Sequence, residues 1–176
     1  MLLEQPRELG LFVRTVDTGV PERHPDERRR LLITQNQTTD QREEGFKDEM
    51  KAYPGVEVLE TQFNDDDANK AASQFQAVLG RVPDLAGVFG ANLFSAGGTA
   101  NGAKQAGVAG KVKMAGFDAP ESIVAQLKDG TFELTIAQHP AEIGYFGLAA
   151  AHAFVTGNPV PTHIGTGFTV MTAANI

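Results

Sequence analysis

Four residues of this sequence, Arg42, Asn92, Asp118 and Gln138, carry planar side chains that form several hydrogen bonds in fixed directions. Asn92, Asp118 and Gln138 come directly or closely after short runs of buried-type residues, as in Ala-Gly-Phe-Asp at 115–118, and Arg42 comes some residues after the run that ends at Thr34. Hydroxyl groups both donate and accept hydrogen bonds. A set of such planar donors and acceptors therefore suits a neutral, polyhydroxylated ligand.

Simpler roles compete with ligand binding at each of the four positions. Asn92 and Asp118 could cap the helices that follow them, because short polar side chains accept hydrogen bonds from the first amides of a helix. Arg42 could form a surface ion pair with an acidic neighbour such as Glu43. Gln138 could be an ordinary residue at the end of a strand. The residues by themselves leave these alternatives open.

The elements that would position these residues follow from the hydrophobic pattern. Strands are predicted over 31–34, 56–62, 86–89, 112–117 and 132–137. Helices are predicted over 39–53, 68–79, 94–106, 120–129 and 140–156. Repeated strand–helix units predict an α/β fold, a doubly wound parallel sheet with helices on both faces and right-handed crossovers. The four polar residues then lie at the carboxyl edge of the sheet, where ligands bind in open α/β folds.

Two of the predicted helices carry further signals. The run Asp65-Asp66-Asp67 precedes the helix over 68–79 and Gly80 follows it, which matches the electrostatic and steric preferences of helix ends. The run lacks the central glycine and distal glutamate of a calcium loop, so helix-end electrostatics is the preferred interpretation. The helix over 94–106 consists largely of small residues and is intrinsically weak, so we expect its backbone to approach the sheet closely.

Composition excludes several classes of function. The 176 residues include no cysteine, which removes disulfides and thiol nucleophiles, and the net charge of -7 argues against a nucleic-acid or anionic-lipid partner. The four histidines lack metal-ligand spacing, and phosphate-loop and serine-nucleophile motifs are missing. We therefore expect no metal, no cofactor and no enzymatic activity. The charged first residues also predict no signal peptide, and no apolar run is long enough for membrane insertion, so the chain as written is compatible with the cytoplasm.

The charge is distributed unevenly along the chain. Residues 1–36 contain six acidic and six basic residues, so the whole excess of negative charge lies in residues 37–176. Residues 21–30 contain no hydrophobic residue. This segment is interpreted as a solvated linker or a damaged junction.

Several motifs along the chain resemble ribose-type periplasmic sugar-binding proteins of ABC importers. They are QREEGF at 41–46, GVFGAN at 87–92, AGFD at 115–118, IAQHP at 136–140 and TAANI at 172–176. The resemblance covers nearly all of residues 31–176. It implies two α/β lobes that close on a sugar and hand it, unmodified, to the membrane permease. Carried over by motif, it makes Arg42, Asn92, Asp118 and Gln138 the sugar ligands of the second lobe.

Residues 1–20 also resemble the family, as a strand of the first lobe, and this makes Asp17 a fifth candidate ligand. The implied organisation is a first-lobe remnant (1–20), an irregular linker or junction (21–30), a sugar-binding lobe (31–138) and a helix with the C-terminal crossover segment (139–176). Most of the first lobe has no counterpart here, so the resemblance implies impaired binding and a helix over 140–156 without its native sheet. It also implies a periplasmic location. The alternatives are the effector-binding domain of a lac-repressor-type regulator, which shares this fold, and a non-functional remnant.

Overall fold

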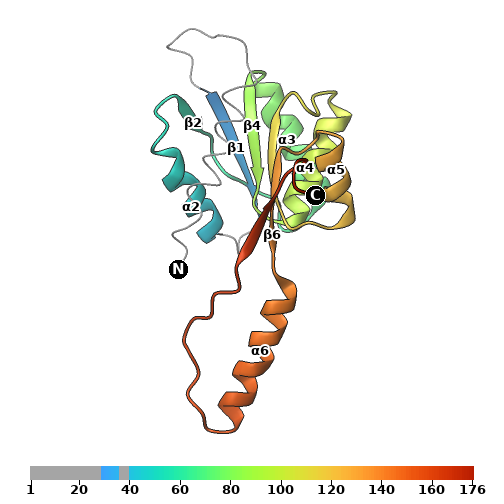
Figure 1. Cartoon of the computed structure of the whole chain (residues 1–176). Helices are drawn as coiled ribbons and strands as arrows, with labels where there is room; N and C mark the ends of the chain where they lie inside the picture. The colour runs from blue at the N-terminus through green and yellow to red at the C-terminus, as the bar shows by residue number, and fades with distance from the viewer. Residues whose placement is uncertain (1–28, 36–39) are drawn as a thin grey trace.

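The computed structural model describes residues 29–35 and 40–176. The strands are β1 (Arg29–Gln35), β2 (Val56–Val58), β3 (Gln62–Phe63), β4 (Leu85–Gly90), β5 (Lys113–Phe117), β6 (Leu134–Gln138) and β7 (Phe168–Met171). The helices are α2 (Asp40–Met50), α3 (Ala68–Arg81), α4 (Leu93–Gln105), α5 (Glu121–Lys128) and α6 (Pro140–Val155). The sheet has the order β2-β1-β4-β5-β6-β7, and β3 pairs with the end of β1 (Figure 1). All pairs are parallel except that of β6 with β7.

Helices cover both faces of this sheet, which confirms the predicted doubly wound α/β fold. Alternate residues of β1 point to opposite faces, as the strand period of two requires. Leu31 and Ile33 join a core with Phe46 of α2. Leu32 joins a second core with Phe75 of α3 and with side chains of α4 and α5. The two cores therefore pack helices against both faces of the central strands.

The main differences from the predicted strands are at β2 and β3, at the start of β1 and at β7. The predicted strand over 56–62 is two short strands, because the chain leaves the ladder at residues 59–61 and rejoins β1 further along. Strand β1 begins at Arg29, inside the segment interpreted as a linker, and Arg30 there pairs with Asp84. The hydrophobic pattern predicts no strand at β7 (Phe168–Met171). This strand is half-buried and antiparallel at the edge of the sheet, so its sequence lacks the continuous apolar run of the central strands.

Helix α4 approaches its neighbours as closely as its small residues allow. A Cβ atom on Gly90 would lie 2.5 Å from the Cα of Ala96, and one on Gly98 would lie 2.3 Å from the carbonyl oxygen of Ala68 in α3. The expected close approach to the sheet is therefore confirmed, and α3 is approached in the same way. Gly80, in contrast, does not end α3, which continues to Arg81.

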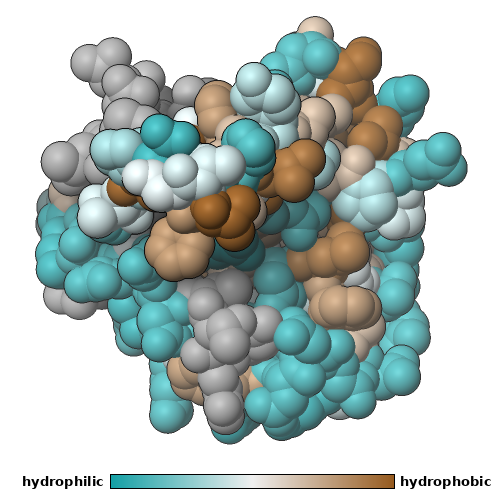
Figure 2. Space-filling model, turned by 90° about the horizontal axis from the view of Figure 1, so that it is seen from below, coloured by the Kyte–Doolittle hydropathy of each residue, from teal (hydrophilic) through white to brown (hydrophobic). Residues whose placement is uncertain are grey.

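Helix α6 projects away from the sheet, and the chain returns to β7 through an extended segment (Figure 1). None of the helix residues is buried, and the side chains of Tyr145, Leu148 and Phe154 are 70%, 75% and 77% exposed. Seen from below, where α6 points toward the viewer, hydrophobic side chains are exposed among hydrophilic ones (Figure 2). The apolar side chains of α6 are thus left uncovered by the described part of the chain. In the described part of the chain, every helix is too short or too polar to cross a membrane.

Candidate functional site

The four candidate residues lie at the carboxyl ends of the strands, and Arg42 and Asn92 follow the two strands between which the strand order reverses. Strand β1 has β2 on one side and β4 on the other, and ligands of open α/β folds bind at such a switch point. Arg42 stands in the first turn of α2, after β1, and Asn92 follows β4. Asp118 directly follows β5, and Gln138 is the last residue of β6. The predicted placement at one edge is thus observed, whereas Asp17 lies outside the described residues.

Arg42 joins the ends of β4 and β5. Its Nη1 atom donates a hydrogen bond of 2.8 Å to the carbonyl oxygen of Ala91, and its guanidinium carbon lies 3.6 Å from the centroid of the Phe117 ring. Burial lowers the pKa of the Arg42 guanidinium, and the negative charge of Asp118 partly offsets this. The group stays protonated at physiological pH. A surface ion pair with Glu43 is therefore the wrong interpretation of Arg42.

Asp118 and Gln138 contact one another directly. Nε2 of Gln138 donates a hydrogen bond of 2.6 Å to Oδ1 of Asp118. The backbone of Asp118 has a φ of 65°, in the left-handed region, and hydrogen bonds hold it there: its amide donates to Ile136, and its carbonyl accepts from the Thr135 hydroxyl. Helix α5 begins after Pro120, which carries no side-chain cap, so the capping interpretation of Asp118 is wrong.

Asn92 does cap a helix, as the alternative interpretation predicted. It is 7% exposed, and its Oδ1 atom accepts a hydrogen bond of 2.8 Å from the amide of Ser95 at the start of α4. Its Nδ2 atom donates in turn to Oδ1 of Asp66, at 2.9 Å. Helix-end electrostatics is the role of Asp67, which caps α3 by accepting from two amides of its first turn. The linear sequence holds no signal that separates Asp66 from the aspartates beside it.

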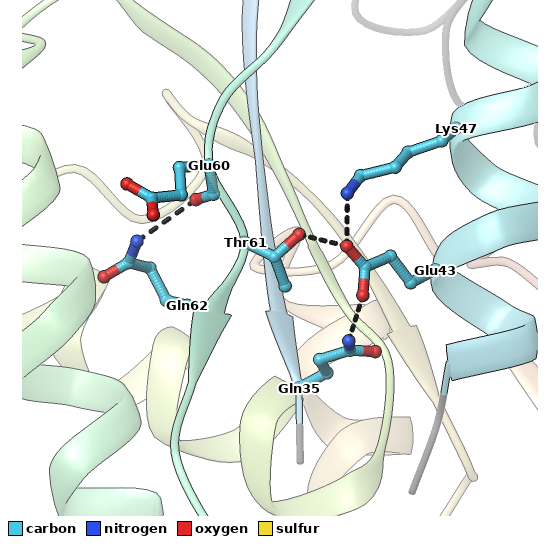
Figure 3. A network of polar contacts seen from close by, with 6 residues as sticks. All are labelled: Gln35, Glu43, Lys47, Glu60, Thr61 and Gln62. Carbon is cyan, nitrogen blue, oxygen red and sulfur yellow. Dashed lines mark hydrogen bonds and ion pairs between the residues drawn. The ribbon is translucent and has the colours of Figure 1, made fainter. Parts of the chain in front are cut away.

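A second set of contacts fixes the start of α2 and was not anticipated. The Glu43 carboxylate accepts hydrogen bonds from the side chains of Gln35, Lys47 and Thr61, which we call the Glu43 network (Figure 3). Burial alone would raise the pKa of Glu43, but the hydrogen bonds from the network outweigh burial and lower this pKa from its ordinary value. The network therefore ties the first turn of α2 to the end of β1 and to Thr61.

The four side chains at this edge are hydrogen-bonding groups. The Asp118 carboxylate accepts hydrogen bonds, the Arg42 guanidinium donates them, and the amides of Asn92 and Gln138 do both. Among the described residues, no three histidine or acidic side chains are grouped so that they could hold a metal ion.

A family model described as the periplasmic binding protein domain matches residues 33–159. The chain belongs to this family. A D-ribose/D-allose-binding protein of Pseudomonas aeruginosa is 33% identical over 123 residues, which are 70% of this chain and 38% of that protein. The ribose import binding protein of Haemophilus influenzae is 32% identical over 124 residues, 70% of this chain and 41% of that protein.

Solved structures give the same result. A solute-binding protein of an ABC transporter from Agrobacterium vitis, bound with α-D-tagatopyranose, is 51% identical with a TM-score of 0.85 over 97% of this chain and 57% of its own. A second from the same organism, with bound D-fucose, is 26% identical with a TM-score of 0.85. The chain spans roughly two fifths of the length of the two curated relatives, from Pseudomonas aeruginosa and Haemophilus influenzae. The family is one of sugar-binding transport proteins and not of enzymes, and these relatives do not favour the transcriptional regulator.

Proposed function

We propose that this lobe binds one side of a neutral sugar, as part of the solute-binding component of an ABC importer, and that Arg42, Asn92, Asp118 and Gln138 are its ligand residues. The observation that carries the proposal is the geometry around Asp118. Its backbone is held in the left-handed region by hydrogen bonds with Thr135 and Ile136 of β6, and residues in such sparsely populated conformations gather at functional sites. Gln138 fixes one carboxylate oxygen, and Arg42 supplies positive charge nearby.

These groups match the hydroxyls of a sugar. A carboxylate accepts hydrogen bonds from neighbouring hydroxyls, and a guanidinium donates to the hydroxyl and ring oxygens. Bonds to the two charged groups contribute about 1.5–3 kcal/mol each, roughly twice a neutral hydrogen bond. D-Tagatose, D-ribose and D-allose are the first candidates, because relatives are named for them or hold them. The sugar would be bound in the periplasm and passed, unmodified, to a permease in the membrane.

One lobe supplies only part of the contacts of a closed, two-lobed site. We therefore expect a dissociation constant of about 1 mM or weaker, which corresponds to about 4 kcal/mol of binding free energy. Calorimetry of the chain with each of the three sugars measures this value. Micromolar binding would contradict the expectation, because it would require a full complement of buried hydrogen bonds from a single lobe.

The residue assignment is tested by nuclear magnetic resonance titration of the isotope-labelled chain with D-tagatose, D-ribose and D-allose. We expect shifts at the amides of Asn92, Asp118 and Gln138. Asp118→Asn keeps the side-chain shape but loses a charge-assisted bond, so it should weaken binding about tenfold. Asp129→Asn is the matched control. It removes the same charge from the end of α5, which runs back toward the amino ends of the strands, away from the candidate site. Asparagine at this position retains the oxygen that accepts a hydrogen bond from Thr131.

Two results would refute the assignment. The first is the absence of shifts at the carboxyl edge of the sheet with all three sugars at high millimolar concentration. The second is an equal effect of Asp118→Asn and Asp129→Asn, because an equal effect would reflect only the change in net charge.

A further inference from the structure

Helix α6 exposes large apolar side chains along one side. Leu148 and Val155, which share this side, are 75% and 77% exposed. Phe146, Ala150 and Ala153 on the opposite side of the helix are less exposed. The most exposed side of α6 is therefore the one that the described part of the chain leaves open.

The residues on the open side have the spacing of a coiled-coil seam. Steps of three and four residues alternate from Ala141 through Gly144, Leu148 and Ala151 to Val155, and we call these five residues the α6 seam. All five are exposed, and a Cβ atom added at Gly144 would meet nothing within 4 Å. Large residues at 148 and 155 alternate with small ones at 144 and 151. Such a seam is suited to pack against another helix.

A second copy of α6 complements the seam when the two helices are antiparallel. With the twofold axis between residues 149 and 150, Leu148 faces Ala151 of the other copy, and Gly144 faces Val155. Each of these layers joins a large residue to a small one, which lets two helices interlock without voids. A parallel pair would place each residue opposite itself, so it would leave gaps at Gly144 and Ala151.

The flanks of the seam fit the same antiparallel arrangement. Phe154 lies over Gly147 of the other copy, where the structure has open space, and Tyr145 lies beside His152. Glu142 is the only Asp, Glu, Lys or Arg residue in α6. The antiparallel pair keeps its two Glu142 carboxylates at opposite ends of the interface, so like charges do not face each other there.

The shape of the chain leaves room for such a pair. Helix α6 projects away from the sheet (Figure 1), and its 16 residues give it a length of about 24 Å. Two antiparallel copies therefore hold their sheets at opposite ends of the pair. An aromatic side chain buries about 150–250 Å², so one short helix supplies less than the roughly 800 Å² per partner of a standard interface. We expect a weak dimer that forms at high concentration.

We propose that α6 is the interface of an antiparallel homodimer, in which a second copy of this chain covers the α6 seam. The occupant is a second copy because the seam is complementary to itself in shape and carries no charge that would oppose the pairing. The inference concerns the helix surface and not the carboxyl edge of the sheet, so it does not depend on the proposed sugar-binding function.

The first test is sedimentation equilibrium of the full chain from low to high micromolar concentration, which should show a monomer–dimer equilibrium. Ala151→Glu places a charge in the seam and should weaken the dimer at least about tenfold. Ala149→Glu is the matched control, because it makes the same change two residues away on a side of α6 that is turned away from the seam. The control should stay within about twofold of the unmodified chain. Both alanines are exposed, so both variants should keep the urea midpoint of the unmodified monomer.

The second test reads the orientation of the helices. The chain has no cysteine, so Gly144→Cys and Val155→Cys each introduce a single thiol. In the antiparallel dimer these two positions face each other. An equimolar mixture of the two variants should therefore form disulfides mainly between unlike chains under mild oxidation. A parallel dimer would instead join each variant to itself.

The outcomes decide the proposal. A chain that stays monomeric at every concentration would overturn it, and so would association that Ala149→Glu weakens as much as Ala151→Glu. Disulfides mainly between identical variants would overturn the antiparallel arrangement. A dimer that only Ala151→Glu disrupts, together with disulfides between unlike variants, supports the proposal.

Discussion

Arg42 offers a direct test of how the candidate site is held together. The side chain of Arg42→Ala would lose the hydrogen bond to Ala91 and the contact with Phe117. A hydrogen bond from a charged group contributes about 1.5–3 kcal/mol to stability, and a partly exposed cation–π contact contributes about 0.5–1 kcal/mol. The released side chain regains about 1.5–2 kcal/mol of conformational entropy. We therefore expect Arg42→Ala to lower the free energy of unfolding by about 1–2 kcal/mol.

The assay is urea unfolding followed by far-ultraviolet circular dichroism, because the chain has no tryptophan. Lys51→Ala is the matched control. It also removes a cation near α2, but the ion pair of Lys51 with Asp48 is exposed and screened by solvent, so its loss should leave the urea midpoint almost unchanged. Arg42→Lys should behave more like Arg42→Ala than like the unmodified chain, because lysine keeps the charge without the planar group that stacks on Phe117. Equal stability of Arg42→Ala and Lys51→Ala would refute this account of the site.

Two further predictions concern the packing of α4 and the Glu43 network. Gly98→Ala should lower the free energy of unfolding by about 1–3 kcal/mol, because its Cβ would meet the backbone of Ala68. Gly97→Ala has open space around its Cβ, so it should leave this free energy unchanged or raise it by up to about 1 kcal/mol. Equal unfolding midpoints of the two variants would contradict the packing of α3 on α4. Glu43→Gln should destabilise the chain by about 1 kcal/mol at pH 7. The folded pKa of Glu43 is lowered, so its contribution is present above the unfolded value and is lost as the pH falls through the folded value. The gap in urea midpoint between the two proteins should therefore close under acidic conditions, and a gap that persists there would contradict the network's role.

Much of the fold could be predicted because it depends on local signals. The continuous apolar runs at β1, β4 and β5 are typical of strands buried on both faces, and the structure buries these strands. The helical periodicity before Gly80 likewise predicted α3, although the glycine lies inside the helix. Strand β7 could not be predicted in this way, because an edge strand is specified by its partner and Phe168–Met171 pairs with β6 from a distance of some thirty residues along the chain.

The site was predictable in position but not in detail. The residues after each strand had to meet at one edge because all the central strands are parallel, and this placed Arg42, Asn92, Asp118 and Gln138 correctly. Their partners come from elsewhere in the chain. Asp66 is 26 residues from Asn92, and no rule of spacing links them. That they bind a sugar stays a prediction until the titrations are done.

Helix α6 shows where a sequence pattern stops being informative. Its apolar residues recur at helical spacing, and the helix forms as predicted, yet none of its side chains is buried in the described structure. A hydrophobic stripe indicates that a face is suited to burial, but what covers that face depends on which other surface is present. The two solved relatives that match this chain with a TM-score of 0.85 are longer proteins, and the match covers 57% of each of them. The stability of the lobe therefore rests on the two cores that flank the sheet, and α6 contributes no burial to either of them.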